Sequence, residues 1–112
     1  MKKSGYIDYI SDSITSLGGI KTRKMFGGYG MYKNGVFFAI ISEDIVYFKV
    51  DKHNQPDYEM YGSKPFSYEG KNKKVITVSY WQVPPDVFDD HSMLEQWVKK
   101  AVFAAQRAKK TE

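Results

Sequence analysis

The 112-residue chain contains no cysteine, only two histidines, and no apolar run longer than the six residues from Val36 to Ile41. The lack of cysteine excludes disulfides, thiol catalysis, iron–sulfur clusters and cysteine-ligated zinc. The short apolar run excludes a membrane-spanning helix, which needs about 18 residues. Two isolated histidines give no repeated metal-ligand spacing. We therefore expect a soluble, cytoplasmic protein that binds no metal ion and no other cofactor.

Aromatic residues are abundant, at 16% of the chain, and nine of them are tyrosines. Lys and Arg number 17 against 13 Asp and Glu, which gives a net charge of +4. A β-rich fold explains the aromatics, because Tyr and Phe suit pleated surfaces. A nucleic-acid binder or a protein-interaction module is the alternative, but the net charge is modest for a dedicated DNA binder. The length fits one domain, over residues 1–112.

Hydrophobic spacing predicts three helices. They lie near residues 5–17, 55–61 and 91–108. Ser4 is the expected N-cap of the first helix and Gly18-Gly19 its end. Asn54 is the expected N-cap of the second helix, whose first turn holds Pro56 and whose end is Gly62.

The remaining apolar segments have period two and predict five strands. They lie near residues 24–32, 36–42, 45–50, 65–69 and 74–81. Asn34-Gly35 predicts a two-residue hairpin, and Pro84-Pro85 closes the last strand. The resulting order, α-β-β-β-α-β-β-α, predicts an α+β domain in which helices cover one face of a five-stranded antiparallel sheet in two layers.

The segment Gly27-Gly28-Tyr29-Gly30 invites comparison with a phosphate-binding loop. A dinucleotide fingerprint needs its glycines between a strand and a helix, whereas here they are placed inside the first strand. We therefore interpret them as structural. Alternation puts Met25 and Gly27 on one face and Phe26, Gly28 and Gly30 on the other, where missing side chains allow a bulge or close backbone approach.

The last helix has an apolar stripe that we expect to pack on the sheet. It consists of Leu94, Trp97, Val98, Ala101, Val102, Ala105 and Ala108. Ser92 and Glu95 have capping-box spacing. Phe103 falls opposite the stripe, among the cations Lys99, Lys100, Arg107 and Lys110. This set is the candidate contact surface for a second copy of the chain, for another protein or for phosphates. An incidental exposed aromatic is the alternative.

No catalytic constellation is apparent. Asp89-Asp90-His91 is better explained as the start of a helix than as a metal cluster, because carboxylates stabilise helix N-termini. His53 lies in a polar loop. No nucleophile, base and orienting residue occur at a recognisable spacing. We expect a non-enzyme, although a small-ligand pocket is invisible at this stage.

The sequence resembles the TfoX/Sxy N-terminal domain family over nearly the whole chain. The likeness is carried by Arg23–Tyr32, Gly35–Ala39, Tyr47–Asp51, Gly62–Tyr68, Ser79–Pro84 and Trp97. Within these segments Met25-Phe26-Gly27-Gly28-Tyr29-Gly30 and Tyr80-Trp81-Gln82-Val83-Pro84 are the most specific. The family motif residues at Met25, Phe26, Gly27, Gly28, Gly30, Tyr80, Trp81 and Pro84 look structural.

The resemblance implies an α+β fold similar to type III secretion chaperones. It also implies a regulator of natural competence for DNA transformation, since Sxy-type proteins are transcription coactivators that act with the cyclic-AMP receptor protein. It supplies no catalytic residues. We expect a regulatory protein that contacts a protein partner and binds DNA directly only weakly or not at all. The alternative is a self-associating, chaperone-like dimeric adaptor unrelated to DNA.

Overall fold

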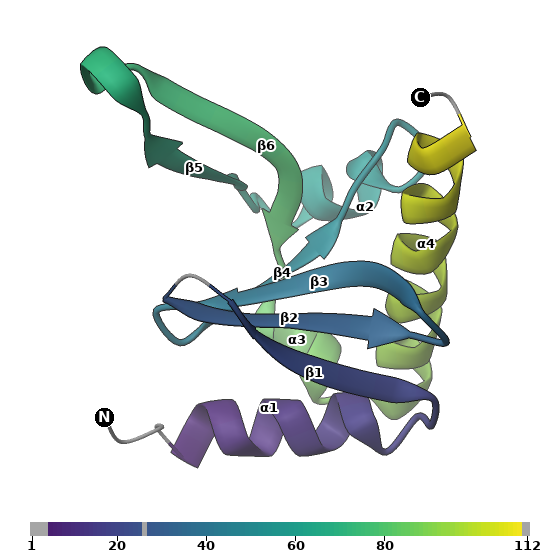
Figure 1. Ribbon diagram of the computed structural model, residues 1–112. Helices are drawn as coiled ribbons and strands as arrows, with labels where there is room; N and C mark the ends of the chain where they lie inside the picture. The colour runs from purple at the N-terminus through teal and green to yellow at the C-terminus, as the bar shows by residue number, and fades with distance from the viewer. Residues whose placement is uncertain (1–4, 26, 111–112) are drawn as a thin grey trace.

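The computed structural model describes residues 5–25 and 27–110 (Figure 1). In chain order the elements are α1 (Gly5–Thr15), β1 (Ile20–Met25), β2 (Gly28–Lys33), β3 (Val36–Ser42), β4 (Ile45–Lys49), α2 (Gln55–Met60), β5 (Pro65–Glu69), the 3-10 turn η1 (Lys71–Lys73), β6 (Val75–Gln82), α3 (Pro85–Phe88) and α4 (His91–Lys110). The predicted α+β class is confirmed. None of the helices in these ranges combines the length and apolar character needed to cross a membrane.

The strands form one antiparallel sheet in the order β1-β2-β3-β4-β6-β5. The chain leaves β4, forms α2 and β5, and returns as β6 beside β4. The prediction of five strands was wrong, because the sheet has six. The expected single strand near residues 24–32 is a hairpin of β1 and β2. β1 escaped the sequence pattern because it is a polar edge strand whose residues from Lys21 to Met25 are all exposed.

The glycine segment therefore does not lie inside one strand. Gly27, with φ +67°, falls between β1 and β2, in the left-handed region that glycine tolerates. Met25 pairs with Gly28 across this reversal. Met25 consequently shares a face with Gly28 and Gly30 rather than with Gly27, which corrects the alternation inferred from sequence. Phe26 lies outside the described residues.

Gly28 and Gly30 each have close neighbours where a side chain would lie. A Cβ built on Gly28 would stand 2.0 Å from the backbone oxygen of Ile41 on the neighbouring strand β3. One built on Gly30 would stand 2.6 Å from the ring of Phe37 and 2.7 Å from the sulfur of Met25. These glycines let β2 approach β3 and let two large side chains lie over its backbone.

The predicted turns are present. Asn34 and Gly35 have φ values of 49° and 86° between β2 and β3, as a type I′ hairpin requires. Gly62 ends α2 in the left-handed region, where its N–H bonds to the carbonyl of Glu59 and that of Ser63 bonds to Tyr58. The first helix ends at Thr15, just before the Gly18-Gly19 turn.

Two predicted caps were wrong. Asn54 precedes α2, but its buried side chain does not cap the helix. It accepts a hydrogen bond from the N–H of Asp51 at 2.8 Å and donates to the carbonyl of Lys49 at 3.1 Å, closing the loop after β4. At α4 the carboxylate of Asp90, not Ser92, accepts the N–H of Met93. The short helix α3 was missed, since Pro84-Pro85 suggested only an end to β6.

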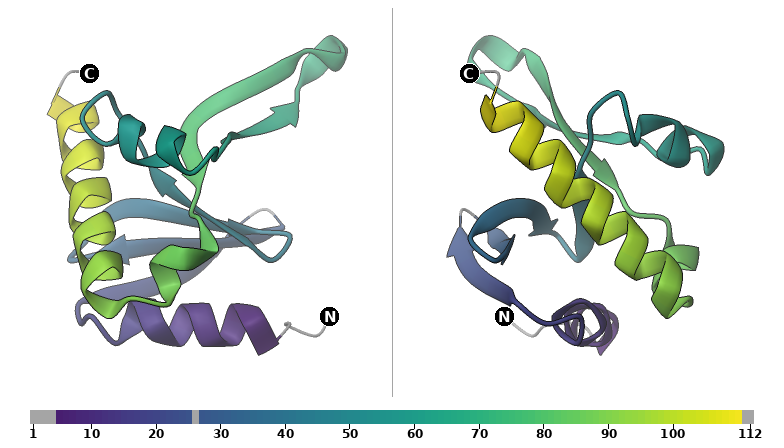
Figure 2. Two further views of the ribbon diagram at one scale, coloured as in Figure 1. Left: turned by 180° about the vertical axis from the view of Figure 1, so that it is seen from behind. Right: turned by 90° about the vertical axis from the view of Figure 1, so that its right-hand side faces the viewer.

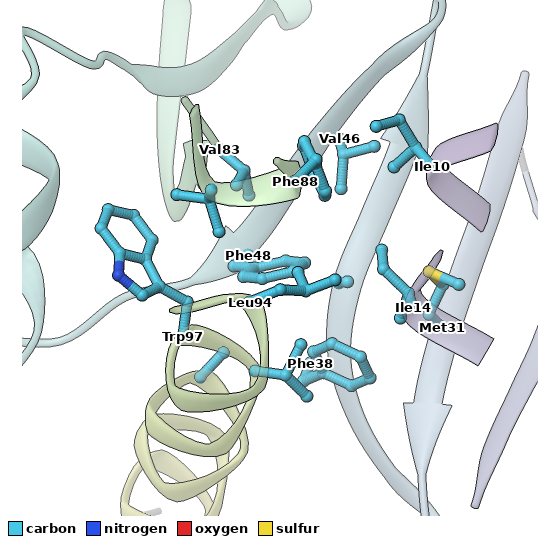
Figure 3. Close-up of a cluster of buried hydrophobic side chains, with 14 of the residues drawn as sticks. Ile10, Ile14, Met31, Phe38, Val46, Phe48, Val83, Phe88, Leu94 and Trp97 are labelled. Carbon is cyan, nitrogen blue, oxygen red and sulfur yellow. The ribbon is translucent and has the colours of Figure 1, made fainter. Parts of the chain in front are cut away.

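The core lies between the sheet and the helices α1, α3 and α4 (Figure 3). Its sheet side is formed by Met31, Phe38, Ala39, Ile41, Val46 and Phe48. Ile10 and Ile14 of α1 cover Met31, while Leu94 and Trp97 of α4 lie toward Phe48. The expected stripe of α4 is confirmed, with Leu94, Trp97, Val98 and Ala101 buried and Val102, Ala105 and Ala108 half-buried. These helices all bury the same face of the sheet.

Substituting Gly28 tests the close approach of β2 to β3. Gly28→Ala places a methyl group into the backbone of Ile41, and we expect a loss of about 2–3 kcal/mol in unfolding free energy. Gly5→Ala is the matched control, because no described residue lies within 4 Å of a Cβ there. Urea unfolding of both variants measures the difference. Equal stability of the two would contradict the strand pairing described here.

Candidate functional site

One flank of α4, with residues before β1 and at the β2–β3 turn, borders a hollow of about 300 Å³, which we call the α4 hollow. Its apolar walls are Leu17, Val36, Val98, Val102 and Phe103. Phe103 is 49% exposed, so the expectation that it points away from the core is met. Lys33, Asn34, Glu95, Lys99 and Gln106 complete the rim. The hollow thus combines a half-exposed ring with apolar walls and charges of both signs.

The cations predicted around Phe103 do not all gather there. Lys99 lines the α4 hollow and is exposed. Lys100 instead pairs with Asp57 at 2.8 Å. Arg107 reaches Asp51 with its Nε at 2.6 Å and its Nη2 at 3.1 Å. The side chain of Lys110 lies outside the described part of the structure.

The Asp51–Arg107 pair ties the end of α4 to the loop after β4. The second oxygen of the Asp51 carboxylate also accepts the N–H of His53 at 2.9 Å. The hydrogen bonds from Arg107 lower the pKa of Asp51 below its usual value. Burial of the carboxylate acts in the opposite direction, but its effect is smaller. Together with the Asn54 bonds, this pair fixes the last turns of α4 beside Lys49.

The sheet face opposite the core carries a row of side chains across five strands. The register pairs Lys21 with Tyr32, Tyr32 with Phe37, and Lys49 with Tyr80. The Tyr32 and Phe37 rings are 5.1 Å apart, and the Phe37 and Tyr80 rings are 5.7 Å apart. The ammonium group of Lys49 lies 5.2 Å from the centre of the Tyr80 ring. We call these five residues the cross-strand row.

Burial raises the pKa of Tyr80 to about 12, with a smaller contribution from Tyr32. Tyr80 therefore stays protonated at neutral pH and presents a hydrogen-bond donor beside Lys49. Further along the same face Tyr47 packs edge-on against Phe66 at 4.8 Å. Burial, and secondarily the charge of Glu43, raise the pKa of Tyr47. Aromatic side chains thus make up much of the sheet face opposite the core.

The other motif residues lie around a second aromatic cluster. Trp81 faces the core beside Tyr58, with ring centres 6.3 Å apart, and Tyr58 packs on Trp97 at 4.5 Å. Pro84 is buried where β6 gives way to α3. Burial, with a smaller effect of Asp57, raises the pKa of Tyr58. Among the described side chains, the Tyr58 hydroxyl is a buried polar group without a hydrogen-bond partner.

Comparison with known families identifies the family of this chain. Residues 12–105 match the family model of the TfoX N-terminal domain. The chain belongs to the TfoX N-terminal domain family. The match spans the end of α1, the entire sheet and most of α4, so it includes the cross-strand row and all of the α4 hollow except Gln106. A search of curated proteins finds no match.

Sequence reasoning located Phe103 but missed the cross-strand row. Tyr32, Phe37 and Tyr80 all lie in predicted strands. Because β1 and β2 were predicted as one strand, the pairing that places these three side chains on one face could not be inferred. An irregularity between Met31 and Tyr32 leaves Phe38 opposite no residue of β2. Phe38 and Ala39 are therefore both buried in the core, while Phe37 pairs with Tyr32 on the opposite face, where simple alternation would have placed it with Ala39. The available signal was the Gly27-Gly28 dipeptide, which favours a turn.

The Asp51–Arg107 pair makes stability depend on acid pH. Because the pKa of Asp51 is lower in the folded protein, the stabilisation is complete above about pH 4 and is lost as pH falls below that value. Both side chains are partly exposed, so Asp51→Asn should cost no more than about 1 kcal/mol at pH 7. Urea unfolding at pH 7 and pH 3 should show this difference shrinking at the lower pH. A difference that grows toward pH 3 would contradict the assignment.

Because the Tyr58 hydroxyl is buried without a hydrogen-bond partner among the described residues, removing it should not destabilise the protein. Tyr58→Phe removes a buried polar group that makes no hydrogen bond, so stability should stay unchanged or rise by up to about 1 kcal/mol. In the matched control, Tyr9→Phe, the lost hydroxyl donates to the carbonyl of Phe88 at 3.3 Å. That control should not gain stability. Thermal unfolding compares the two, and a clear loss in Tyr58→Phe would show that its hydroxyl has a partner.

Proposed function

We propose that this TfoX N-terminal domain is a non-enzymatic regulatory module that acts by protein–protein contact in the transcriptional regulation of competence for DNA transformation. Family membership supports the regulatory role. The resemblance implies cooperation with a DNA-bound factor such as the cyclic-AMP receptor protein. It brings no catalytic residues, so the module acts by binding alone.

The α4 hollow is the contact surface in this proposal, and the exposure of Phe103 is the observation that carries it. A half-exposed Phe next to apolar walls gains free energy when a partner covers it. Lys33, Lys99 and Glu95 surround these walls as a charged rim. An apolar centre with a polar rim is the usual anatomy of a protein interface.

The intramolecular ion pairs reduce the number of predicted cations that can contact a partner. Lys100 and Arg107 already hold Asp57 and Asp51, so they position α4 rather than offer free charge. Lys99 is the cation of the predicted set that lines the hollow beside Phe103. A partner that contacts Phe103 therefore meets Lys99, Lys33 and the carboxylate of Glu95.

A binding assay with the purified receptor protein tests this function. The receptor, cyclic AMP and a labelled promoter duplex form a complex, and adding this chain should increase its fluorescence anisotropy. The chain should barely shift the duplex in the absence of the receptor. Phe103→Asp should weaken the effect at least tenfold, because it places a charge in the apolar centre.

Met60→Asp is the matched control, since Met60 is 86% exposed on α2 and lies outside the α4 hollow. It should bind the receptor complex within twofold of the wild type. No anisotropy change with the wild-type chain, or equal losses in both variants, would contradict the proposal.

A second candidate function is a self-associating adaptor similar to type III secretion chaperones. The observation that favours it is the β5–β6 hairpin, which extends away from the body of the domain (Figure 2). Val75 near its tip is 71% exposed, and isolated hairpins are marginally stable in water. Sedimentation equilibrium separates the two functions. A stable dimer that does not affect the receptor complex favours the adaptor.

A further inference from the structure

Two surface hollows lie along the sheet face opposite the core, which α4 borders with its last turns. The first, about 730 Å³, is lined along β1 by Lys21, Thr22 and Arg23. The second, about 320 Å³, is lined by Phe37, Lys49, Tyr80 and the last turns of α4. Tyr32 and Gly35 line both. Because the two hollows share these residues, we treat them together as one surface along the cross-strand row, which we call the sheet groove.

The charge of the sheet groove has one sign. Its cations are Lys21, Arg23, Lys49 and Lys109, and none of the described lining residues is Asp or Glu. The nearest carboxylate along the chain from Lys49 is Asp51, which is already paired with Arg107. Lys21, Arg23 and Lys109 are exposed at the rim. The groove therefore favours a polyanion.

The floor of the groove is aromatic. Tyr32, Phe37 and Tyr80 form a continuous row, with neighbouring ring centres 5.1 Å and 5.7 Å apart. All three are partly exposed. Tyr80, a neutral hydroxyl donor, and the side-chain amides of Asn34 and Gln106 add polar groups along the walls. Planar, partly polar rings fit such a floor better than an aliphatic chain does.

We propose that the sheet groove binds single-stranded nucleic acid, with bases on the Tyr32–Phe37–Tyr80 floor and phosphates at the four cations. Aromatic rings on an antiparallel sheet with cations at the rim are a general arrangement for unpaired bases. The row crosses five strands, about 19 Å at the usual strand spacing, which holds a few nucleotides. This binding goes beyond the proposed function, which concerns the α4 hollow and a protein partner.

The same features disfavour other occupants. A duplex hides the faces of its bases, so the aromatic floor would stay uncovered. A second copy placed face to face by a two-fold axis would bring the four cations near four others. A polyanion without rings would pair with the cations but would leave the Tyr32 and Phe37 rings exposed to solvent. A single strand satisfies both the charge and the aromatic floor.

Fluorescence anisotropy with labelled 12-nucleotide oligo-dT, labelled 12-nucleotide oligo-U and a labelled 12-base-pair duplex tests the proposal. The full chain should bind at least one single strand at least tenfold more tightly than the duplex at low salt. The two single strands show whether DNA or RNA is preferred. With four phosphate contacts the slope of log K against log salt should approach about −3.

Charge variants locate the site. Lys21→Gln with Lys49→Gln should weaken binding at least tenfold and make the salt slope shallower by about 1.4, because two phosphate contacts are lost. The matched control is Lys71→Gln with Lys73→Gln, an equal change of charge at the exposed tip of the β5–β6 hairpin. It should bind within twofold of the wild type. Equal losses in the two double variants would overturn the proposal.

Ring variants test base contact. Tyr32→Leu keeps an apolar side chain but removes the ring, and should weaken oligo-dT binding about tenfold, since a base stacked on an aromatic contributes roughly 1–3 kcal/mol. Tyr61→Leu, an exposed tyrosine outside the groove, is the control. Polyphosphate should compete only weakly. Binding that Tyr32→Leu leaves unchanged and polyphosphate abolishes would show a ring-independent polyanion site instead.

Two further outcomes would also overturn the inference. One is the absence of binding to both single strands at low salt. The other is concentration-dependent self-association that Tyr32→Leu abolishes, which would assign the face to a second copy. Amide chemical-shift changes on adding oligo-dT to the wild type should centre on β1, Gly35 and the end of β4. Changes centred on Phe103 and the α4 hollow would contradict it.

Discussion

One-sided packing governs this domain. Helices α1, α3 and α4 all bury the sheet face that carries Phe38 and Phe48 (Figure 3). On the opposite face, α4 borders the cross-strand row with its last turns, and the rings of that row stay partly exposed. Burial of the face that carries Phe38 and Phe48 supplies the main stabilisation through removal of apolar surface from water. It also explains why Tyr32, Phe37 and Tyr80 stay partly exposed and why Phe103 is half-exposed, since these rings lie outside the buried face.

The end of α4 links the two candidate surfaces. The helix has 20 residues, about 30 Å, so it extends past the core to the end of β4. Arg107 and Asp51 hold it there, and Asn54 closes the loop that positions Asp51. Val36 and Gln106 line both the α4 hollow and the sheet groove. A protein on one surface and a nucleic-acid strand on the other would therefore be neighbours.

Much of the fold was predictable from local patterns, because helices, tight turns and the α4 stripe depend on neighbouring residues. Asn34-Gly35 and Gly62 specify their turns directly. β1 was not predictable by periodicity, since an exposed edge strand of Lys, Thr and Arg buries almost nothing. Phe103 could be placed by helical geometry alone. The ion pairs of Lys100 and Arg107 could not, because their partners Asp57 and Asp51 are 43 and 56 residues away.

The solvent accessibility of individual aromatic rings tests one-sided packing of the sheet most directly. A soluble paramagnetic reagent broadens the NMR signals of side chains that it can approach. In a sample shown to be monomeric, the account predicts strong broadening for Tyr32, Phe37 and Phe103, and little for Phe38 and Phe48. Equal protection of Phe37 and Phe38 would mean that both faces of the sheet are covered, and would contradict one-sided packing.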